Sequence, residues 1–516
     1  IALTSHARKH GLAITPRNVL LGRTVAEIAE LATDARPGAK SDVGTGILSS
    51  TPIIRWLEEL TDRLDGFYQS VTVQVPAGAN AHDVRRALQA VLDHHDMLRA
   101  RLLRDGGAWR LEVPEPGAVD AGGLLARVDV PPHPGSAADL VALIAEHEAL
   151  AVARLDPDAG VMLQAVFLDR TTATGQPAPG RLVLAAHHLV VDGVSWRILI
   201  EDLATAWTQI QAGDSIELAA VPTSFRTWAQ ALQRAGRDRA RAAEQPLWEA
   251  TAIRPAGRFA TRPLDPQRDT AATIRERTIT LESACTASLL GRAPAALGVT
   301  INDILLGGLG AAAAEWRRRS GRPAGSGTLV ALEGHGREEH VAGADLSRTI
   351  GWFTSTFPVH LDVATDIWPG VEAGEREVVE PLVAGVGAAL CAIADGGLGY
   401  GILRYLDPAA RDALAVAAQP ELQFNYLGRY IAQQGGDWRT PADLSPLNGG
   451  RGADMPAGYP LVLDAMAVDV DGLPELRASW EWAAAVLQED DVMALGELWF
   501  VALRGIVRAA TPRRSQ

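Results

Sequence analysis

Apolar and polar positions in the first half of the chain follow two periods. The stretch "FYQSVTVQVP", residues 67–76, alternates and predicts a strand with one buried face. The stretch "GRLVLAAHHL", residues 180–189, is almost continuously apolar and predicts a buried strand. Residues 81–102 and 193–210 have apolar side chains three and four positions apart, which predicts amphipathic helices. A further helix is expected to begin at Pro52, with Thr51 as its N-cap.

The second half shows the same two periods. Strands are predicted within "ATIRERTITL" (272–281), at the start of "GTLVALEGHGREE" (327–339) and in "ELQFNYLGRY" (421–430). The stretch "TINDILLGGLGAAAAEWRRR" (300–319) predicts a long helix, and a charged, proline-containing stretch over about 226–270 joins the halves. Because strands and helices mix in both halves, we expect an α/β fold in which each half is a sheet backed by helices.

Length, charge and cysteine content exclude several classes of protein. A chain of 516 residues is too long for one ordinary core, so two large lobes are expected. The net charge of −14 has no long single-sign block, which argues against nucleic-acid binding. Cys285 and Cys391 lie far apart, so neither a disulfide framework nor a cysteine metal site is expected. With no apolar run near the ~18 residues of a membrane span and no signal peptide, we expect a cytoplasmic protein.

Lysine is almost absent, and this removes two kinds of chemistry. The chain has only Lys9 and Lys40, and both precede the main body. A pyridoxal-phosphate enzyme needs a lysine for its Schiff base, and a P-loop needs the lysine of Gly-Lys-Ser/Thr. Residues 41–516 can therefore support neither.

Two histidines and an acid lie together in "AAHHLVVDGVSW", residues 185–196. A metal site needs three or four converging ligands, and this segment has no cysteine or third histidine. For His187 and Asp192 we favour structural roles, with a packed ring and a carboxylate that pins the turn through an ion pair. His188 suits a catalytic base, because imidazole titrates near neutral pH.

The spacing His-His-x-x-x-Asp-Gly resembles the signature of the condensation-type domains of nonribosomal peptide synthetases and their chloramphenicol-acetyltransferase-like relatives. Four further stretches resemble the epimerization branch of that superfamily: "DGVSW" (192–196), "LEGHGRE" (332–338), "DLSRTIGWFTSTFP" (345–358) and "QFNYLGRY" (423–430). Their order and spacing match over residues 44–500. The sequence is therefore similar to an epimerization domain, which converts an L-aminoacyl or peptidyl thioester on a carrier into its D form.

The resemblance implies two chloramphenicol-acetyltransferase-like lobes in a V, with a tunnel for the pantetheine thioester between them. It also implies that His188 and Glu333, one from each lobe, act on opposite faces of the α-carbon. Inversion needs two acid–base groups of suitable pKa. Because residues 41–516 have no lysine for pyridoxal phosphate, acid–base catalysis without a cofactor is the mechanism that remains. Which group serves which face is left open.

Further residues are expected in or near this site. His187, Asp192 and Ser195 belong to the histidine segment, and Asn425 and Tyr426 are candidates for polar contacts to the enolate or the pantetheine arm. Trp352 is expected to pack. His335 and Arg337 either orient Glu333 or pair with Asp192. No metal and no cofactor of its own is expected, because the substrate arrives on the 4′-phosphopantetheine of a carrier domain.

The first residues resemble the C-terminal part of a peptidyl carrier domain, just after its modified serine, which is not in this chain. We therefore expect a fragment of a larger modular synthetase, with the carrier domain and other synthetase modules as partners. The expected boundaries are 1–35 for the carrier remnant with its short helices, 36–43 for a linker, 44–225 for the N-terminal lobe and 226–516 for the C-terminal lobe.

Two stretches resemble motifs of other protein classes, and two other functions share features with this sequence. "AGDSIEL" (212–218) imitates a phosphopantetheine attachment motif but is expected to be a loop, and "GLGAAA" (308–313) imitates a dinucleotide fingerprint inside a predicted helix. A condensation domain would share the histidine motif, but it is not expected to combine Glu-Gly-His-Gly-Arg with Phe-Asn-Tyr-Leu-Gly. An inactive recruitment domain tends to lose the second histidine, and His188 is present.

Overall fold

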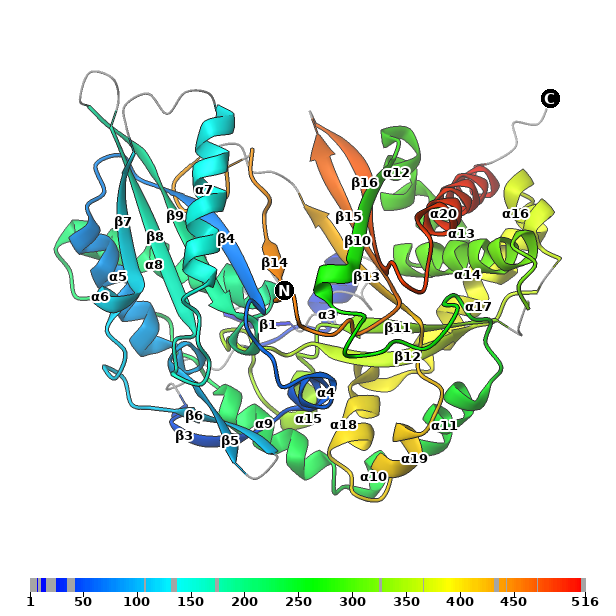
Figure 1. The fold of residues 1–516 in the computed structure, drawn as a ribbon, viewed down its shortest axis with the longest axis horizontal. Coiled ribbons are helices and arrows are strands. Elements are labelled where there is room, and N and C mark those ends of the chain that lie inside the picture. Colours follow the sequence, from blue (N-terminus) through cyan, green and yellow to red (C-terminus); the bar gives the residue numbers. More distant parts are fainter. Residues whose placement is uncertain are drawn as a thin grey trace.

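The structure is a computed structural model that describes residues 7, 11–14, 25–34, 42–105, 108–130, 137–171, 176–323, 327–364, 366–430, 436–441, 443–470 and 472–511. Its elements form two halves that meet at the bottom of Figure 1 and lean apart above, in a V. One half is built on a five-stranded sheet and the other on a six-stranded sheet. The mixed α/β fold expected from the sequence is confirmed.

The five-stranded sheet is covered by helices on both faces, because its central strands are apolar on both faces. Val166 and Val183 cluster with α7 on one side, while Phe167 and Leu184 cluster with α5 and α8 on the other. The strand order is β14-β4-β9-β8-β7. The strands are β4 (Tyr68–Val75), β7 (Leu125–Val130), β8 (Leu163–Thr171), β9 (Pro177–His187) and β14 (Asn448–Gly450), and the helices are α5 (Ala81–His94), α6 (Ala121–Leu124), α7 (Ala137–Val152) and α8 (Gly193–Ala212).

A small sheet and one helix complete the base of this half. Helix α4 (Pro52–Leu60) begins as predicted, with Thr51 at the N-cap and Pro52 as its first residue. The three-stranded sheet has the order β3-β6-β5. Its strands are β3 (Gly46–Ser49), β5 (Arg101–Asp105) and β6 (Ala108–Val113).

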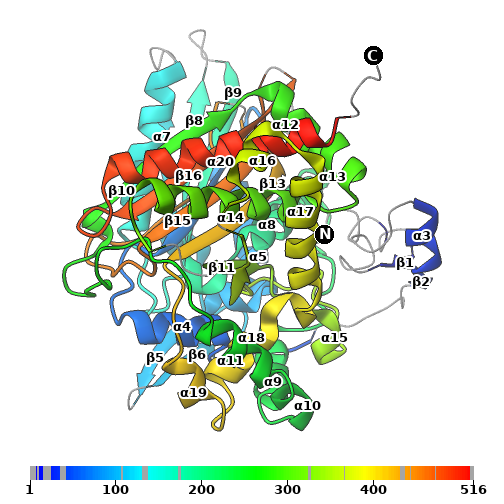
Figure 2. The same ribbon diagram turned by 90° about the vertical axis from the view of Figure 1, so that its right-hand side faces the viewer.

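The six-stranded sheet has the order β10-β16-β15-β13-β11-β12 and packs its helices α14 and α20 on one face (Figure 2). Phe424 and Trp480 contact Trp499 of α20 at ring-centroid distances of 6.4 and 6.1 Å. Alternate residues on the same strands face the other way and include polar side chains. The strands are β10 (Ile274–Leu281), β11 (Thr328–Gly334), β12 (Ser355–Leu361), β13 (Leu422–Tyr430), β15 (Leu461–Val470) and β16 (Leu473–Ala483).

The remaining helices surround this sheet and connect the halves. They are α9 (Phe225–Ala235), α10 (Arg239–Ala242), α11 (Gln245–Ile253), α12 (Ser283–Leu290), α13 (Arg292–Leu297), α14 (Ile301–Arg319), α15 (Glu339–Ala342), α16 (Trp368–Ala373), α17 (Arg376–Cys391), α18 (Leu398–Tyr405), α19 (Arg411–Ala415) and α20 (Glu489–Ala509). Among the described helices, none alone is long and apolar enough to cross a bilayer. Only the pair formed by α17 and the segment Ala394–Tyr405 has that length and apolarity, and the two are bent by 80° relative to each other.

The two stretches that resemble motifs of other proteins, "GLGAAA" and "AGDSIEL", form a helix segment and a loop, as predicted. "GLGAAA" lies within α14, where a Cβ on Gly308 would be 3.0 Å from Leu503 of α20, so the glycine permits close helix packing. "AGDSIEL" follows the end of α8, and Gly213 closes that helix with φ +76°. The residues after Gly213 form a loop without regular structure, as predicted.

A segment of the second half completes the sheet of the first half. β14 pairs antiparallel with β4, with Gly449 opposite Gln69. Upstream of β14, the Trp438 N–H donates to the Gln74 carbonyl at 2.7 Å, and the Gln74 N–H donates to the Arg439 carbonyl at 2.9 Å. In Figure 1, orange β14 lies beside blue β4, between the two halves. The edge of the first sheet is therefore formed by residues from beyond position 430.

The helix predicted over 81–102 is shorter than expected. α5 ends at His94, and a 3-10 turn (Asp96–Arg99) leads into β5. The Arg99 guanidinium donates to the Leu92 and Asp93 carbonyls and so caps the helix. Tertiary partners of His95 and Arg99, which periodicity does not reveal, stop the helix here.

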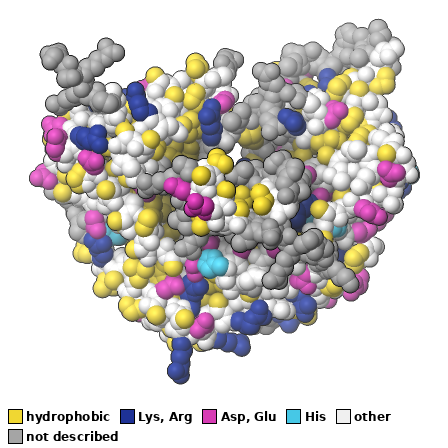
Figure 3. Space-filling view, turned by 180° about the vertical axis from the view of Figure 1, so that it is seen from behind, with side chains coloured by type: hydrophobic (Ala, Val, Ile, Leu, Met, Phe, Trp, Pro, Cys, Tyr) yellow, Lys and Arg dark blue, Asp and Glu magenta, His cyan; other side chains and the backbone are white. Residues whose placement is uncertain are grey.

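The described N-terminal residues contain one short helix, as expected, and a pair of two-residue strands that were not predicted from the sequence. Helix α3 (Val25–Glu30) and the antiparallel pair of β1 (Leu12–Ala13) and β2 (Thr33–Asp34) are described, whereas most of 1–24 and 35–41 lies outside the described residues. On the face in Figure 3, basic and acidic side chains are interspersed over the described surface, in line with the mixed charge pattern.

Candidate active site

His188 follows β9, and its neighbours fix its tautomer. Its Nδ1 lies 2.9 Å from the Val191 carbonyl oxygen, which can only accept, so Nδ1 carries the proton. Its Nε2 is then an acceptor for the Gln69 side-chain N–H at 3.1 Å. The Gln69 oxygen accepts the Trp196 indole N–H at 3.1 Å, which sets the orientation of the amide. This chain of hydrogen bonds presents His188 as a neutral imidazole with a basic nitrogen.

Two aromatic side chains hold the His188 ring. Phe67 stacks on it at 4.9 Å between ring centroids, and Trp352 lies at 4.8 Å. Trp352 is buried, as expected, and comes from the segment that precedes β12 in the second half. Burial lowers the pKa of His188, although the charge of Asp192 opposes the shift. The ring is therefore neutral and fixed where the two halves meet.

His187 has the surroundings of a structural residue. Its ring is buried, Nε2 lies 3.2 Å from the Leu64 carbonyl, and Nδ1 accepts the Leu189 N–H at 3.3 Å. Burial lowers the pKa of His187 to about 4. Since both ring nitrogens are used by the backbone, His187 has no free nitrogen for proton transfer.

Asp192 caps α8 and forms a buried ion pair across the two halves. Its Oδ1 accepts the Ser195 N–H at 2.8 Å and the Ser195 hydroxyl at 2.7 Å. One Arg337 nitrogen lies 2.9 and 3.0 Å from the two carboxylate oxygens, and the side chains are only 4% and 9% exposed. Of the two roles considered for Arg337, the structure shows the pairing with Asp192.

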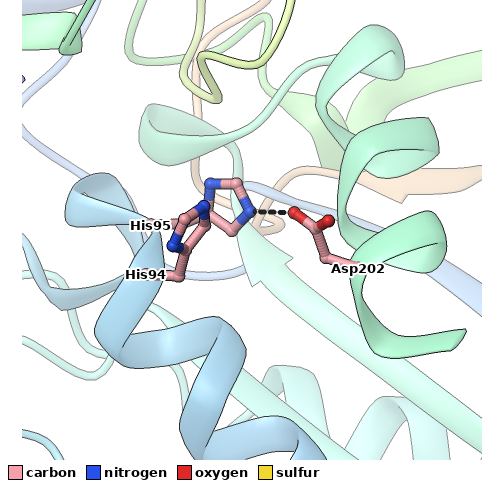
Figure 4. Close-up of side chains that lie close together, drawn as sticks. All are labelled: His94, His95 and Asp202. Atoms are coloured by element: carbon pink, nitrogen blue, oxygen red, sulfur yellow. Dashed lines mark hydrogen bonds and ion pairs between the residues drawn. The ribbon is translucent and has the colours of Figure 1, made fainter. Parts of the chain in front are cut away.

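A second polar junction lies further along α8 (Figure 4). The His95 ring is 2.7 Å from Oδ2 of Asp202, and Arg348 of the second half binds Oδ1 of the same carboxylate. Nε2 of the neighbouring His94 lies 2.8 Å from the Ala219 carbonyl. His94, His95 and Asp202 are close enough to one another to share a metal ion. Arg348, however, already supplies a positive charge at the Asp202 carboxylate. The cluster is an ion-pair junction between the halves.

Glu333 lies near the end of β11 on the face of the sheet opposite α14 and α20. Leu332 beside it points into the helix-covered core, so alternation turns Glu333 to the other side. The Gln423 amide donates to Oε1, and the Asn425 amide donates to Oε2 at 3.2 Å. Burial raises the pKa of Glu333 to about 7, and the Gln423 hydrogen bond offsets only part of this shift. Near neutral pH the carboxyl can therefore give or take a proton.

The glycines of "EGHGRE" are explained by the tight loop after β11. Gly336 has φ +64°, and a Cβ there would lie 1.7 Å from the Phe353 carbonyl oxygen. A Cβ on Gly334 would lie 2.6 Å from the Ser355 hydroxyl. A side chain at either position would displace the loop that adjoins Glu333 and carries Arg337.

Of Asn425, Tyr426 and His335, Asn425 alone has a described hydrogen bond to Glu333. Asn425 shares its face, but Tyr426 is the next residue on β13 and packs against the core of the second half. Among the described contacts, Tyr426 touches neither Glu333 nor His188, and its contact to the enolate or the pantetheine arm stays a prediction. His335 accepts the Arg337 N–H at 3.0 Å through Nδ1, so it does not orient Glu333 directly.

Sequence reasoning missed Gln69, Gln423 and Asp464. Gln69 and Gln423 bind His188 and Glu333, and Asp464 of β15 is paired in register with Asn425. Each is a single polar residue in an alternating strand, where the pattern predicts only which face it occupies. The one available signal was for Gln423, which begins the quoted stretch "QFNYLGRY".

The fold and the histidine motif define a known class of protein. A family model described as "Condensation domain" matches residues 137–448. This chain therefore belongs to the condensation domain family. Domains of this family act without a cofactor of their own, on substrates carried by the phosphopantetheine of a separate carrier domain.

Two curated relatives of this chain are synthases of Brevibacillus parabrevis. A linear gramicidin synthase polypeptide of Brevibacillus parabrevis is 33% identical over 523 residues, which cover 98% of this chain and 6% of that protein. Tyrocidine synthase 1 of the same organism is 28% identical over 528 residues, or 100% of this chain and 45% of that protein. The chain thus spans less than half the length of these curated relatives.

Solved structures agree on the fold. The epimerization domain from the third module of tyrocidine synthetase B has a TM-score of 0.74 at 27% identity, and the match covers 92% of this chain and 100% of that one. The X-domain from teicoplanin biosynthesis has a TM-score of 0.63 at 17% identity, with 91% and 97% covered, which is a likeness of fold.

Proposed function

We propose that this chain epimerizes the α-carbon of an L-aminoacyl or peptidyl thioester that a carrier domain delivers on phosphopantetheine. The observation that carries the proposal is the combination of a neutral, basic His188 with a half-buried Glu333, held by Gln423 and Asn425, whose pKa is raised to about 7. Inversion removes a proton from one face of the α-carbon and returns one to the other, which needs two such groups. The similarity to a solved epimerization domain over 92% of this chain supports the assignment.

The resting protonation states suit one direction of turnover. Neutral His188 takes the α-proton through Nε2 after the Gln69 N–H has left that nitrogen, and protonated Glu333 gives its proton to the opposite face. The enzyme is left with imidazolium and carboxylate, which is the form that acts on the D isomer. The enolate oxygen that forms in between needs a hydrogen-bond donor, and the Gln69 amide, which donates to Nε2 in the free protein, takes that role when Nε2 is protonated.

The same proposal covers the organisation of the chain and its partners. Residues 1–35 belong to a carrier domain, 36–43 form a linker, and 44–225 and 226–516 form the two lobes. The partners are a carrier domain with its tethered substrate and other modules of a synthetase. The relatives that are named as synthases of linear gramicidin and tyrocidine support this setting.

Exchange of the α-proton with D₂O tests the proposal. L-aminoacyl and N-acyl-aminoacyl thioesters on a separate holo-carrier, or on pantetheine, are incubated with the protein, and the hydrolysed amino acid is analysed for deuterium and chirality. We expect deuterium uptake with D product, which falls at least about 10²-fold in His188→Ala and Glu333→Ala. Uptake without inversion in one variant would identify the residue that returns the proton.

The same assay distinguishes the other functions considered. If the wild-type protein exchanged no α-proton but formed a peptide bond after an acceptor was added, it would be a condensation domain. If it bound holo-carrier and did neither, it would be a recruitment domain. Either result would overturn the proposal.

A further inference from the structure

A second half-buried acid lies on the same sheet as Glu333, and the proposed reaction does not use it. Asp464 is on β15, directly opposite Asn425 of β13, and Asn425 binds the Glu333 carboxylate. Leu463 and Ala465 on either side point into the core of the second half, so Asp464 points to the face that carries Glu333. The two carboxyl groups thus share one face of the sheet.

One strand, β13, separates the strands that carry these two carboxyl groups. Neighbouring strands lie about 4.8 Å apart, so β11 and β15 are separated by roughly twice that spacing. The Glu333 carboxylate, however, is bound by Gln423 and Asn425, which both belong to the intervening strand β13. It is therefore drawn over β13, toward Asp464.

Asp464 has no partner of opposite charge at hydrogen-bond distance among the described residues. Burial and the nearby charges of Glu333, Glu481 and Glu276 raise the pKa of Asp464 to about 7, and Arg451 opposes them. The Arg451 guanidinium is itself bound to Glu481. A cation bound beside Asp464 would favour the ionised carboxylate and pair with it.

We propose that Asp464 binds the α-ammonium group of the substrate, so that this site acts on aminoacyl thioesters with a free amine in preference to N-acylated peptidyl thioesters. This inference rests on the proposed epimerization. The ammonium is one bond from the carbon that Glu333 serves, which fits a second carboxylate one strand away. A cation at the end of a substrate side chain would lie several bonds further off.

The ammonium also assists the chemistry. A positive charge on the α-nitrogen withdraws electrons and makes the α-proton more acidic, and the Asp464 carboxylate keeps the nitrogen protonated. An amide nitrogen carries no charge and would leave Asp464 without a counterion. The site therefore favours the amine in binding and in proton removal.

The test compares matched thioesters in the D₂O exchange assay. A panel of L-aminoacyl-pantetheines, each with its N-acetyl derivative, is measured with wild-type protein, Asp464→Asn and Asp469→Asn. Asp469 lies on the same strand but is paired with Arg429 at 2.9 Å, so it is the matched control. We expect wild-type kcat/KM to favour free amines at least about 10-fold. Asp464→Asn should lose this preference and keep its rate on N-acetyl substrates within about 2-fold, and Asp469→Asn should behave as wild type.

Each other outcome counts against the inference. Equal wild-type rates on amine and N-acetyl substrates would overturn it, as would an equal loss on both in a folded Asp464→Asn. Faster exchange of N-acetyl-ornithinyl than of N-acetyl-leucyl pantetheine, abolished by Asp464→Asn, would assign Asp464 to a side-chain cation instead. Absence of exchange with every thioester would reject the proposed epimerization itself, which is a different result.

Discussion

Gln69 lies between the Trp196 indole and the Nε2 atom of His188, with a hydrogen bond of 3.1 Å to each. Gln69→Leu keeps a similar volume but removes both bonds, so the His188 ring loses its support and the enolate loses a donor. We expect kcat for α-proton exchange to fall at least about 10-fold. Gln74→Leu, on the same strand and bound to exposed Asp437, should keep wild-type kcat. An unchanged rate in Gln69→Leu would show that the Gln69 amide has no part in the reaction.

The two candidate catalytic residues also predict a pH dependence. The L isomer needs neutral His188 with protonated Glu333, and the D isomer needs the form in which that proton has moved to His188. These forms hold the same number of protons, so both directions share one bell-shaped profile of kcat/KM. Because the raised pKa of Glu333 is about 7, kcat/KM should decrease above about pH 7 as that proton is lost. Rates measured from about pH 5 to 9 with both isomers check this; a rise through about pH 8 would contradict it.

Among the elements, the first turn of α8 carries a buried ion pair that joins the two halves. Its N-cap residue, Asp192, is paired with Arg337 in a buried contact between the halves. Arg337→Met leaves the carboxylate buried without a counterion, which should lower the free energy of unfolding by about 3 kcal/mol or more. Urea denaturation measures the loss, and the double variant Asp192→Asn/Arg337→Met should recover part of it.

A surface ion pair provides the control for this prediction. Arg127 pairs with Asp129 at 2.7 Å, and its side chain is 51% exposed. Arg127→Met should therefore cost less than about 1 kcal/mol. If Arg337→Met and Arg127→Met lowered the free energy of unfolding equally, the buried Asp192–Arg337 pair would be no more important for stability than a surface pair.

At the same scale, the sequence predicts elements better than it predicts their partners. Periodicity found the strands before His188 and Glu333 and the helix with the "GLGAAA" motif, because burial of one face imposes that pattern. It did not find that α5 stops at His94, since the contacts of His95 with Asp202 and of Arg99 with backbone carbonyls cannot be seen in the pattern. Side-chain contacts between distant elements, such as Gln69 with His188, leave no local pattern to detect.

For the molecule as a whole, the two halves are joined by more than a linker. β14 forms the edge of the first sheet although it comes from residues 448–450, and its "NGG" sequence has little strand propensity. The pairing is thus invisible to sequence patterns. It also means that residues 44–225 alone leave β4 at an open edge.

This crossing predicts how fragments of the protein behave. Residues 44–225 expressed alone should aggregate or unfold without cooperativity, because β4 lacks its partner and α8 lacks Arg337 and Arg348. Co-expression with 226–516 should restore a soluble complex. Size-exclusion chromatography and thermal unfolding monitored by circular dichroism provide the measurements. A monomeric 44–225 fragment with a sharp melting transition would contradict the prediction.

The pairing of β14 with β4 also has a consequence for synthesis on the ribosome. Gly449 and Gln69 are partners about 380 residues apart, and ribosomes add roughly 5–20 residues per second. The edge strand of the first sheet is therefore made roughly 20 to 80 seconds after the strand that it covers. Throughout that interval the nascent first half exposes an unpaired edge, so its final closure must wait until most of the second half has been translated.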